Sequence, residues 1–537
     1  MSELVHDFIF NSARRTPAAA ALAHGARRLD YAALAHAVEG AADTLLRAGV
    51  QRAGRVAVYL EKRVENVAAC FGAAAAGAVF VPVNPLLKAA QVAYILADCS
   101  VAVLVTSIER LRLLAEVLPA CAGLHTVLVT GAGELPVLAG LTVQAWDDRA
   151  REQQAPCMPR HAVIDTDMAA IFYTSGSTGH PKGVVLSHRN LVAGAVSVAS
   201  YLELTAVDRV LSVLPLSFDY GFSQLSTAFH VGASVVLINH LFARDIVTAV
   251  QDESITGLAA VPPLWIQLSQ LAWPAASSLR YLTNSGGAMP VTTVAALRAA
   301  LPCASLFLMY GLTEAFRSTY LPPAELARRP DSMGRAIPNA EVMVVRPDGS
   351  RCDPDEPGEL VHRGALVALG YWNDPARTAE RFRPAPGQDP ALPLPEIAVW
   401  SGDTVRIDAD GFLYFVGRSD DMIKVSGYRI SPAEIEDVVH ATCLVTEVAV
   451  FGVPHPALGQ AIVVLAVAGA GARPVTAAEL LKQCQRRLPA YMVPSHLEIR
   501  TEALPRNPNG KIDRSLLRQS CLNLFEPETP KESTATP

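Results

Sequence analysis

Short β-branched runs alternate with Ala- and Leu-rich helical stretches through most of this chain, and this alternation constrains the fold more than any other feature. In chain order, it occurs in "RVAVYL" and "VENVAACFGAAAAG", in "VAVLVTS" and "ERLRLLAEVL", and in "ASVVLIN" and "RDIVTAVQDE". Alternation of this kind is typical of layered α/β folds with parallel sheets, in which buried helices cover both faces. We therefore predict a large α/β domain in the N-terminal part of the chain.

The texture changes beyond residue 339, where turn signals such as "PDGS" and "DADG" separate the strands and predict a small antiparallel β region. A second, smaller α/β pattern follows, with a helix from about Pro432, two strands, and a helix over 476–488. A charged turn at 418–421 interrupts two apolar stretches, so we place a domain boundary there. The prediction is an N-terminal domain over 1–417, a small C-terminal domain over 418–525 and a polar, disordered tail over 526–537.

Composition excludes several classes of protein. The net charge of −6 and the lack of a Lys/Arg cluster argue against a nucleic-acid partner. The N-terminus has no apolar run of secretory length, and the most apolar stretch, 69–83, is too short and too Gly-broken for a membrane span. We therefore expect a cytoplasmic protein without a membrane span.

Nine cysteines stand singly, without a CxxC pair or zinc spacing, and are expected to be reduced, buried thiols. They are Cys70, Cys99, Cys121, Cys157, Cys303, Cys352, Cys443, Cys484 and Cys521.

The stretch "YTSGSTGHPKG", over 173–183, combines three glycines, four Ser or Thr side chains and one lysine. The glycines permit turns that point successive N–H groups inward, and such a nest suits a polyphosphate. Pro181 precedes Lys182 where a Walker A loop has glycine, so a P-loop NTPase fold is not implied. On composition alone, a flexible connector is an equally good interpretation.

Further motifs follow this loop: "NSGGAMP" over 284–290, "MYGLTE" over 309–314, "GELVHRG" over 358–364, "SGD" over 401–403, "GRSDDMIKVSGYRI" over 417–430 and "LPRNPNGKIDR" over 504–514. In this order they resemble the adenylate-forming superfamily, which includes acyl-CoA synthetases, aryl-CoA ligases, firefly luciferase and the adenylation domains of nonribosomal peptide synthetases. The resemblance covers nearly the whole chain. It implies an acyl-CoA synthetase-like fold with a mobile C-terminal lid domain. It also implies an ATP-dependent ligase that forms an acyl-adenylate, releases pyrophosphate, and then transfers the acyl group to a thiol with release of AMP.

The resemblance further implies an ATP site. Thr174 and Glu314 would hold Mg²⁺, which prefers hard oxygen ligands, and the loop 175–182 would cradle the β- and γ-phosphates. Asp403 would accept hydrogen bonds from the ribose hydroxyls, and an aromatic face with glycine backbone would form the adenine slot. The residues implied to bind ATP are Thr174, Ser175, Gly176, Ser177, Thr178, Gly179, Lys182, Gly286, Gly287, Ala288, Tyr310, Gly311, Thr313, Glu314, Asp403, Arg418 and Lys511.

Lys511 resembles the catalytic lysine of the superfamily, which contacts both the substrate carboxylate and the α-phosphate. Without the other motifs, a solvated lysine after an Asn-Gly turn is the default interpretation. Lys511, Glu314, Thr174 and Lys182 form the implied catalytic set.

The hinge of the lid domain is implied at Asp420, for which an ordinary charged turn is the alternative interpretation. The residues implied to line the thiol channel are Lys424, Gly427 and Tyr428.

Substrate choice is expected in "LPLSFDYGFSQL", over 214–225, where Asp219 follows Phe218. Many acyl- and aryl-CoA ligases have His at this position, whereas amino-acid-activating domains usually have an Asp that pairs with the α-ammonium. An Asp that caps the next segment or bonds within the loop is an equally supported alternative. Arg317 is expected to meet Asp219, a second substrate anion or solvent, because an unpaired guanidinium in a pocket is costly. The implied pocket is small and polar and favours a short or functionalised acid: Phe218, Asp219, Tyr220, Ser223, Ala260, Thr283, Ser285, Met309, Arg317 and Ser318.

The segments 79–99 and 216–225 most resemble stand-alone AMP-forming acyl-CoA ligases associated with bacterial exosortase A. The expected function is therefore an acyl-CoA ligase that uses ATP, Mg²⁺ and CoA. The alternative enzyme is an amino-acid ligase that loads the phosphopantetheine of a carrier protein in trans. From a different class, a nonhydrolysing nucleotide-binding relic of the fold is disfavoured, because every member of the reacting set is present.

Overall fold

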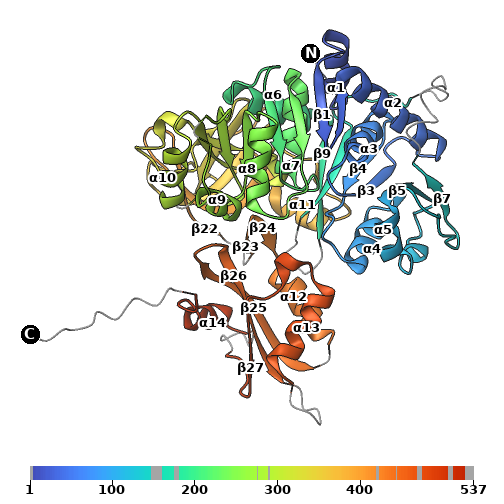
Figure 1. The fold of residues 1–537 in the computed structure, drawn as a ribbon. Coiled ribbons are helices and arrows are strands. Elements are labelled where there is room, and N and C mark those ends of the chain that lie inside the picture. Colours follow the sequence, from blue (N-terminus) through green and yellow to red (C-terminus); the bar gives the residue numbers. More distant parts are fainter. Residues whose placement is uncertain are drawn as a thin grey trace, which may run out of the picture. The chain divides into compact units, whose positions relative to one another are not determined.

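The chain divides into two compact units, one formed by residues 1–174 and 181–419 and one by residues 420–537 (Figure 1). The computed structural model describes residues 4–146, 160–174, 181–274, 276–287, 289, 291–418, 422–442, 444–468, 475–505 and 512–525.

A nine-stranded sheet forms one layer of the first unit, and its central strands β1, β11, β10, β12, β13 and β14 run parallel. Antiparallel strands close its two edges. In spatial order the strands are β16 (Arg335–Ala336), β15 (Thr319–Leu321), β14 (Ser305–Tyr310), β13 (Tyr281–Asn284), β12 (Gly257–Ala260), β10 (Arg209–Ser212), β11 (Ser234–Leu237), β1 (Ala20–His24) and β2 (Arg27–Asp30). The predicted parallel α/β layer is present.

An eight-stranded sheet forms a second layer of this unit. Parallel pairing runs from β8 through β4, β3, β5 and β6 to β7, and β8 pairs antiparallel with β9. In spatial order the strands are β19 (Gly370–Tyr371), β9 (Lys182–Ser187), β8 (Met168–Thr174), β4 (Val79–Pro82), β3 (Arg55–Tyr59), β5 (Val101–Ser107), β6 (Thr126–Thr130) and β7 (Thr142–Ala145).

The region beyond residue 339 forms an antiparallel five-stranded sheet, as the turn signals predicted. Its strands are β17 (Ala340–Val345), β18 (Gly358–Gly364), β21 (Ile397–Ile407), β20 (Phe382–Pro384) and β22 (Leu413–Arg418). Arg418 therefore belongs to the first unit.

Helices of the first unit pack on the two large sheets, and α3 is buried along its whole length. Phe222 of α7 stacks on Phe71 of α3 and on Phe80 of β4, with ring centroids 5.5 Å and 4.9 Å apart. This aromatic cluster fixes α7, whose first turn carries Asp219. The helices are α1 (Asp7–Arg15), α2 (Tyr31–Arg47), α3 (Val64–Ala75), α4 (Ala89–Asp98), α5 (Ile108–Leu114), α6 (His188–Tyr201), α7 (Asp219–Val231), α8 (Ala243–Asp252), α9 (Pro262–Ser269), α10 (Val291–Ala300) and α11 (Pro375–Arg381), with the 3₁₀ turns η1 (Leu118–Ala120), η2 (Thr313–Ala315) and η3 (Pro323–Glu325).

The second unit is a small α/β arrangement with its own apolar core. Its five strands are β24 (Tyr428–Ile430), β23 (Ile423–Val425), β26 (Gly459–Ala468), β25 (Val445–His455) and β27 (His496–Arg500), with the last pairing parallel to β26. Its helices are α12 (Pro432–His440), α13 (Ala477–Arg487) and α14 (Arg514–Ser520), with the 3₁₀ turn η4 (Ala490–Met492).

The structure bears on the expectations about membrane spans and about the burial of the cysteines. Among the described residues, none of the helices has the length and apolarity needed to cross a membrane. The expectation of buried thiols is right for Cys70, Cys99, Cys121, Cys484 and Cys521 but wrong for Cys303 and Cys352, which are exposed and partly exposed. Cys303 lies in the exposed turn between α10 and β14. Cys157, Cys443 and the predicted tail over 526–537 lie outside the described residues.

Candidate active site

The β8–β9 hairpin brackets the hydroxyl-rich loop, so its register positions the two ends of that loop. Thr174, the last residue of β8, lies opposite Lys182, the first residue of β9. The Oγ1 atom of Thr174 is buried and has no hydrogen-bond partner among the residues that the structure describes. The loop residues Ser175, Gly176, Ser177, Thr178 and Gly179 lie outside the described residues.

Lys182, Glu314 and Tyr371 form a compact polar triad. Lys182 Nζ donates hydrogen bonds to Glu314 Oε1 and to the Tyr371 hydroxyl, both at 2.8 Å. The Tyr371 hydroxyl donates in turn to Glu314 Oε1, at 2.7 Å. Glu314 lies in η2 and is 4% exposed, and Tyr371 lies in β19, next to β9. Lys182 and Glu314, both implied to bind ATP, therefore contact each other directly and are also bridged by the Tyr371 hydroxyl.

The ribose- and adenine-binding candidates meet at the ends of β14 and β21. The Tyr310 hydroxyl donates a hydrogen bond to Asp403 Oδ2, and Asp403 is 3% exposed. Arg418 lies directly opposite Asp403 in the β21–β22 register. His362 of β18 stacks on the Tyr310 ring at 6.1 Å between centroids, and burial lowers the pKa of His362 to about 4, although Asp403 and Glu314 raise it in part. A neutral imidazole therefore supports the implied adenine-binding aromatic ring.

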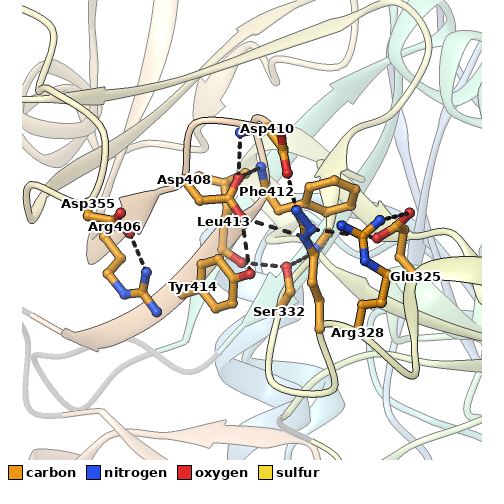
Figure 2. A network of polar contacts seen from close by, with 12 residues as sticks. Glu325, Arg328, Ser332, Asp355, Arg406, Asp408, Asp410, Phe412, Leu413 and Tyr414 are labelled. Atoms are coloured by element: carbon orange, nitrogen blue, oxygen red, sulfur yellow. Dashed lines mark hydrogen bonds and ion pairs between the residues drawn. The ribbon is translucent and has the colours of Figure 1, made fainter.

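A polar network fixes the turn that joins β21 to β22 (Figure 2). Asp408 accepts hydrogen bonds from the N–H groups of Asp410 and Phe412, at 3.0 Å and 2.8 Å, and from the Tyr414 hydroxyl at 3.1 Å. Arg329 pairs with Asp408 and Asp410 and lies over the Phe412 ring, 4.2 Å from its centroid. The hairpin that carries Asp403 and Arg418 is therefore tied to the segment around Arg329.

The turn after β13 and the residues after β14 supply the remaining nucleotide candidates. Gly286 has a φ of +83°, and Asn284 Nδ2 donates to the Gly287 carbonyl at 3.1 Å. Gly311 follows Tyr310, and Thr313 begins η2 with an exposed fraction of 7%. Ala288 lies outside the described residues.

The implied acid pocket is built on the first turn of α7 and on the carboxyl ends of β12, β13 and β14, the edge at which α/β proteins commonly bind ligands. Asp219 is the first residue of α7 and is 5% exposed, and Phe218 precedes it as the N-cap. Burial raises the pKa of Asp219, while Arg317 and the N–H groups of Tyr220 and of Asp219 itself lower it in part. Both interpretations of Asp219, as an amine partner and as a structural residue of this turn, are consistent with that position.

Gly221 permits the pocket loop to fold back on α7, because a methyl group on Gly221 would lie 2.0 Å from the Pro215 carbonyl oxygen. The Tyr220 hydroxyl shares a 2.6 Å hydrogen bond with Thr283 Oγ1. Arg317 donates from Nη2 to Ser223 Oγ at 3.0 Å, and its guanidinium lies 4.4 Å from the centroid of the Tyr220 ring. These contacts join α7, β13 and the segment after η2 into one polar cluster.

The other predicted pocket residues lie at the same strand ends. Ala260 ends β12, Ser285 follows β13, and Met309 in β14 accepts a hydrogen bond from the Tyr201 hydroxyl at its sulfur, at 2.9 Å. Ser318 is 1% exposed, and its Oγ has no hydrogen-bond partner within the described part of the chain.

The predicted thiol-channel residues belong to the second unit. Lys424 lies in β23 and Tyr428 in β24, and the hairpin turn between them uses Ser426 and Gly427 at φ +52° and +86°. Two consecutive positive φ angles are those of a tight hairpin turn, in which glycine is favoured. The predicted hinge Asp420 and the predicted catalytic Lys511 lie outside the described residues, so their placement stays a prediction.

Sequence reasoning did not assign two residues of this site. His362 lies within the motif "GELVHRG", but nothing in the motif indicates that its ring would stack on Tyr310. Tyr371 stands outside the quoted motifs, in "GYWND", and meets Lys182 only because β19 pairs with β9. A short antiparallel pairing between segments so far apart in sequence leaves no local pattern.

Comparison with known proteins identifies the family. A family model described as "AMP-binding enzyme" matches residues 9–372, and one described as "AMP-binding enzyme C-terminal domain" matches residues 434–511. The chain belongs to the AMP-binding enzyme family. The predicted superfamily and fold class are therefore confirmed, as is the prediction of an ATP-dependent ligase at the level of the family.

Individual members of the AMP-binding enzyme family differ in their acids and acceptors. Feruloyl-CoA synthase of an Amycolatopsis species is 33% identical over 94% of this chain and 97% of its own length. The L-proline--[L-prolyl-carrier protein] ligase of Pseudomonas fluorescens is 32% identical over 96% and 99%. The solved structure of the amide bond synthetase McbA from Marinactinospora thermotolerans has a TM-score of 0.83, 26% identity, and coverage of 96% and 99%.

Some relatives are much longer than this chain. A linear gramicidin synthase from Brevibacillus parabrevis is 31% identical over 96% of this chain, which spans 10% of that protein's length.

Proposed function

We propose that this member of the AMP-binding enzyme family is an AMP-forming acyl-CoA ligase. It activates a carboxylic acid with ATP to an acyl-adenylate, with release of pyrophosphate, and then transfers the acyl group to the thiol of CoA with release of AMP. The observation that carries the proposal is the junction of Lys182, Glu314 and Tyr371 beside the hairpin loop, together with Asp403 at the Tyr310 ring. These contacts support the phosphate and ribose roles that the family motifs imply.

The protein's part in the first step is to position and neutralise charge, because phosphoryl chemistry on ATP offers little covalent work for a protein. Lys182 is the cation expected at the β- and γ-phosphates, and Asp403 is the acceptor expected at the ribose. Lys511 is the cation expected between the acid carboxylate and the α-phosphate.

Thr174 and Glu314 fit Mg²⁺ in the chemistry of their donors. The buried Oγ1 of Thr174, without a partner among the described residues, and the carboxylate of Glu314 are hard oxygen ligands. No group of three or more His, Cys, Asp or Glu side chains that suits a metal occurs in the described part of the chain. Mg²⁺ held there would take further oxygens from the nucleotide and would neutralise phosphate charge.

The domain roles form part of the proposal: residues 1–417, together with Arg418 at the end of β22, bind ATP and acid, and the following residues up to 525 act as a mobile lid that carries Lys511. The proposed hinge is Asp420, with Lys424, Gly427 and Tyr428 in the thiol channel. The resemblance of segments 79–99 and 216–225 supports a place among the exosortase A-associated ligases.

A second candidate is an amino-acid ligase that loads a carrier protein in trans. The buried position of Asp219 at the start of α7 favours it, because an ionised carboxylate there suits a substrate ammonium. The prolyl-carrier ligase among the relatives supports the same candidate.

One experiment tests both candidates. Pyrophosphate release is measured with ATP–Mg²⁺, without thiol, across short, hydroxy, aryl and amino acids, in the wild type and in Lys511→Ala. We expect Lys511→Ala to lose on the order of 10²–10³ in rate while ATP still binds. Release with amino acids alone would select the second candidate, and unchanged release in Lys511→Ala would reject the assigned catalytic role.

A further inference from the structure

Arg317 is a buried cation without a counter-ion in the described part of the chain. It is 3% exposed, its Nε has no hydrogen-bond partner among the described residues, and no ion pair within 4.0 Å is found for it there. Its hydrogen bond from Nη2 goes to the neutral hydroxyl of Ser223, at 3.0 Å. A guanidinium removed from water in this way is costly unless an anion and further acceptors meet it. The pocket therefore lacks one negative charge.

The backbone beside Arg317 has a strained conformation where the chain turns the guanidinium toward the Tyr220 ring. Phe316 has a φ of +50°, which is unfavourable for a bulky side chain. The Phe316 ring is fully buried in the core and packs so tightly on α6 that a methyl group on Gly194 would lie 2.3 Å from it. Because the chain turns sharply here, Phe316 enters the core while the guanidinium of Arg317 lies 4.4 Å from the Tyr220 ring centroid.

Asp219 does not supply the missing charge. It is near enough for Arg317 to lower its pKa, but burial has the larger effect and raises that pKa. No ion pair joins the two side chains within the described residues, although Asp219 is only 5% exposed. Asp219 therefore takes up a proton more readily than an exposed Asp and repels an incoming anion less.

The donors that Arg317 leaves available suit a carboxylate. Ser223 accepts from one N–H of Nη2, so Nη2 keeps a second N–H that can form a parallel pair with Nε or with Nη1, and Nε is buried with no partner among the described residues. Nη1 lies 3.7 Å from the position of a methyl group on Gly311, on the side of the adenine slot. A planar guanidinium binds the two oxygens of a carboxylate with parallel hydrogen bonds. A monocarboxylic acid has no carboxylate left for this contact, because its single carboxylate reacts with ATP.

On the basis of the proposed function, we infer that Arg317 binds a second carboxylate of the acid and makes the enzyme selective for short dicarboxylic acids. Ser223 and Thr283, each 1% exposed, place hydroxyl groups near this subsite instead of a long apolar tunnel. An ammonium group beside the second carboxylate, as in an aminodicarboxylic acid, is compatible with Asp219. The acids in the test below include pairs with and without an amino group, so the effects of the ammonium group and of the second carboxylate are measured separately.

The test compares acids that differ by one carboxylate: succinate with butyrate, glutarate with valerate, and aspartate with alanine. Pyrophosphate release without thiol is measured for the wild type, Arg317→Met, Arg317→Lys and the control Arg335→Met. Arg335 is also an arginine near an aromatic ring, 5.9 Å from the Phe412 centroid, but is exposed in β16. We expect the wild type to prefer the dicarboxylate in at least one pair by on the order of 10²-fold in kcat/KM, and Arg317→Met to lose that preference mainly through KM.

The outcomes separate this inference from the proposed function. A wild type that prefers the monocarboxylate in every pair, or an Arg317→Met variant that slows all acids equally, would overturn the subsite. Equal slowing would instead place Arg317 at the reacting carboxylate or in folding, and near-native rates in Arg317→Lys with monocarboxylates would show that the fold is intact.

A binding measurement keeps the subsite testable when no acid releases pyrophosphate. Thermal unfolding is recorded with each acid alone. Stabilisation of the wild type, but not of Arg317→Met, by dicarboxylates would retain the subsite while the ligase assignment failed. Equal stabilisation of both proteins, or of neither, would reject the subsite.

Discussion

Lys182 and Arg317 are cations of the first unit that differ in their partners. Lys182, whose side chain is 17% exposed, pairs with Glu314 at 2.8 Å and bonds to Tyr371. Arg317, at 3% exposure, bonds to one neutral hydroxyl and has no ion pair among the described residues. Internal pairing stabilises the proposed phosphate end of the site without ligand, whereas the proposed acid end carries a charge with no ion-pair partner in the described part of the chain, which a ligand can satisfy. Substitutions at the paired end should therefore remove favourable contacts, whereas removing the carboxylate of Asp219 near Arg317 should raise the free energy of unfolding.

The largest effect is expected at the paired end, for Glu314→Gln. The change removes the negative charge that meets Lys182 and the carboxylate proposed to hold Mg²⁺, so pyrophosphate release should fall on the order of 10²–10³-fold. Glu65→Gln is the matched control. Glu65 lies in α3, is 9% exposed, and pairs with Arg27 and Arg63 at 2.8 Å and 2.6 Å. The control should lower thermal stability and leave the rate within about twofold. A similar loss of rate in both variants would show that the effect is structural.

The next effect concerns pH and the neutral ring behind Tyr310. An unfolded His binds a proton below pH 6.5, whereas His362 in the fold binds one only near its pKa of about 4. Between these values the unfolded state binds more protons, so stability is present above about pH 6.5 and is lost as the pH falls toward 4. From pH 7 to pH 5 this group alone should cost about 2 kcal/mol in the free energy of unfolding.

His362→Phe keeps an aromatic ring and removes that titration. Urea unfolding followed by tryptophan fluorescence reports on the first unit, since all five tryptophans precede residue 419. The variant should lose less stability than the wild type over this pH interval. Identical pH slopes would show that other groups, such as the buried His6 and His188, account for the whole effect.

Asp219 and Asp208 extend the comparison to two buried carboxylates. Burial raises the pKa of Asp219 above its reference value of 3.8, so the stability associated with its proton is present below that value and is lost at pH 7. Burial also raises the pKa of Asp208, but hydrogen bonds from Arg280, Thr256 and the Thr205 N–H, with the charge of Arg280, leave it lowered. Asp208 is thus stabilising as an anion, and Asp219 is not.

Asp219→Asn should therefore raise the free energy of unfolding at pH 7 by on the order of 1 kcal/mol, and Asp208→Asn should lower it. Thermal unfolding at pH 7 and at pH 4 measures both variants. The gain in Asp219→Asn should shrink as the pH falls toward 4, because the raised pKa lets the wild-type carboxyl group take up a proton there more readily than an exposed Asp does. A loss of stability in both variants would mean that Asp219 has an internal partner as effective as Arg280.

The difference between the paired and the unpaired end also marks how far sequence could predict this molecule. Ordered motifs predicted a common site for Lys182, Glu314, Asp403 and Tyr310, because strand ends and turns carry local signals of glycine and hydroxyl residues. The structure brings Lys182 to Glu314 and Tyr310 to Asp403. The partner of Lys182 was not predictable in full, since Tyr371 reaches it through a pairing of β19 with β9. The sequence could not predict that Arg317 and Asp219 form no ion pair among the described residues. The direction of Arg317 follows from the positive φ of Phe316, and this angle is set by packing against Gly194 in the folded core.

The smallest effect is expected for Tyr371→Phe, which sharpens the comparison at the paired end. The change removes the hydroxyl that bridges Lys182 and Glu314 but keeps the ring, whose centroid lies 4.2 Å from Lys182 Nζ. The loss of a net hydrogen bond should raise KM for ATP about threefold, with KM for the acid unchanged. Tyr59→Phe is the control, since the Tyr59 hydroxyl donates to the Leu87 carbonyl at 2.9 Å and Arg110 lies 4.7 Å from its ring centroid. Steady-state kinetics with varied ATP and with varied acid measure both KM values for each variant. If KM for the acid rises as much as KM for ATP, or if Tyr59→Phe has the same effect, Tyr371 supports the fold in general and does not position the phosphate-binding pair.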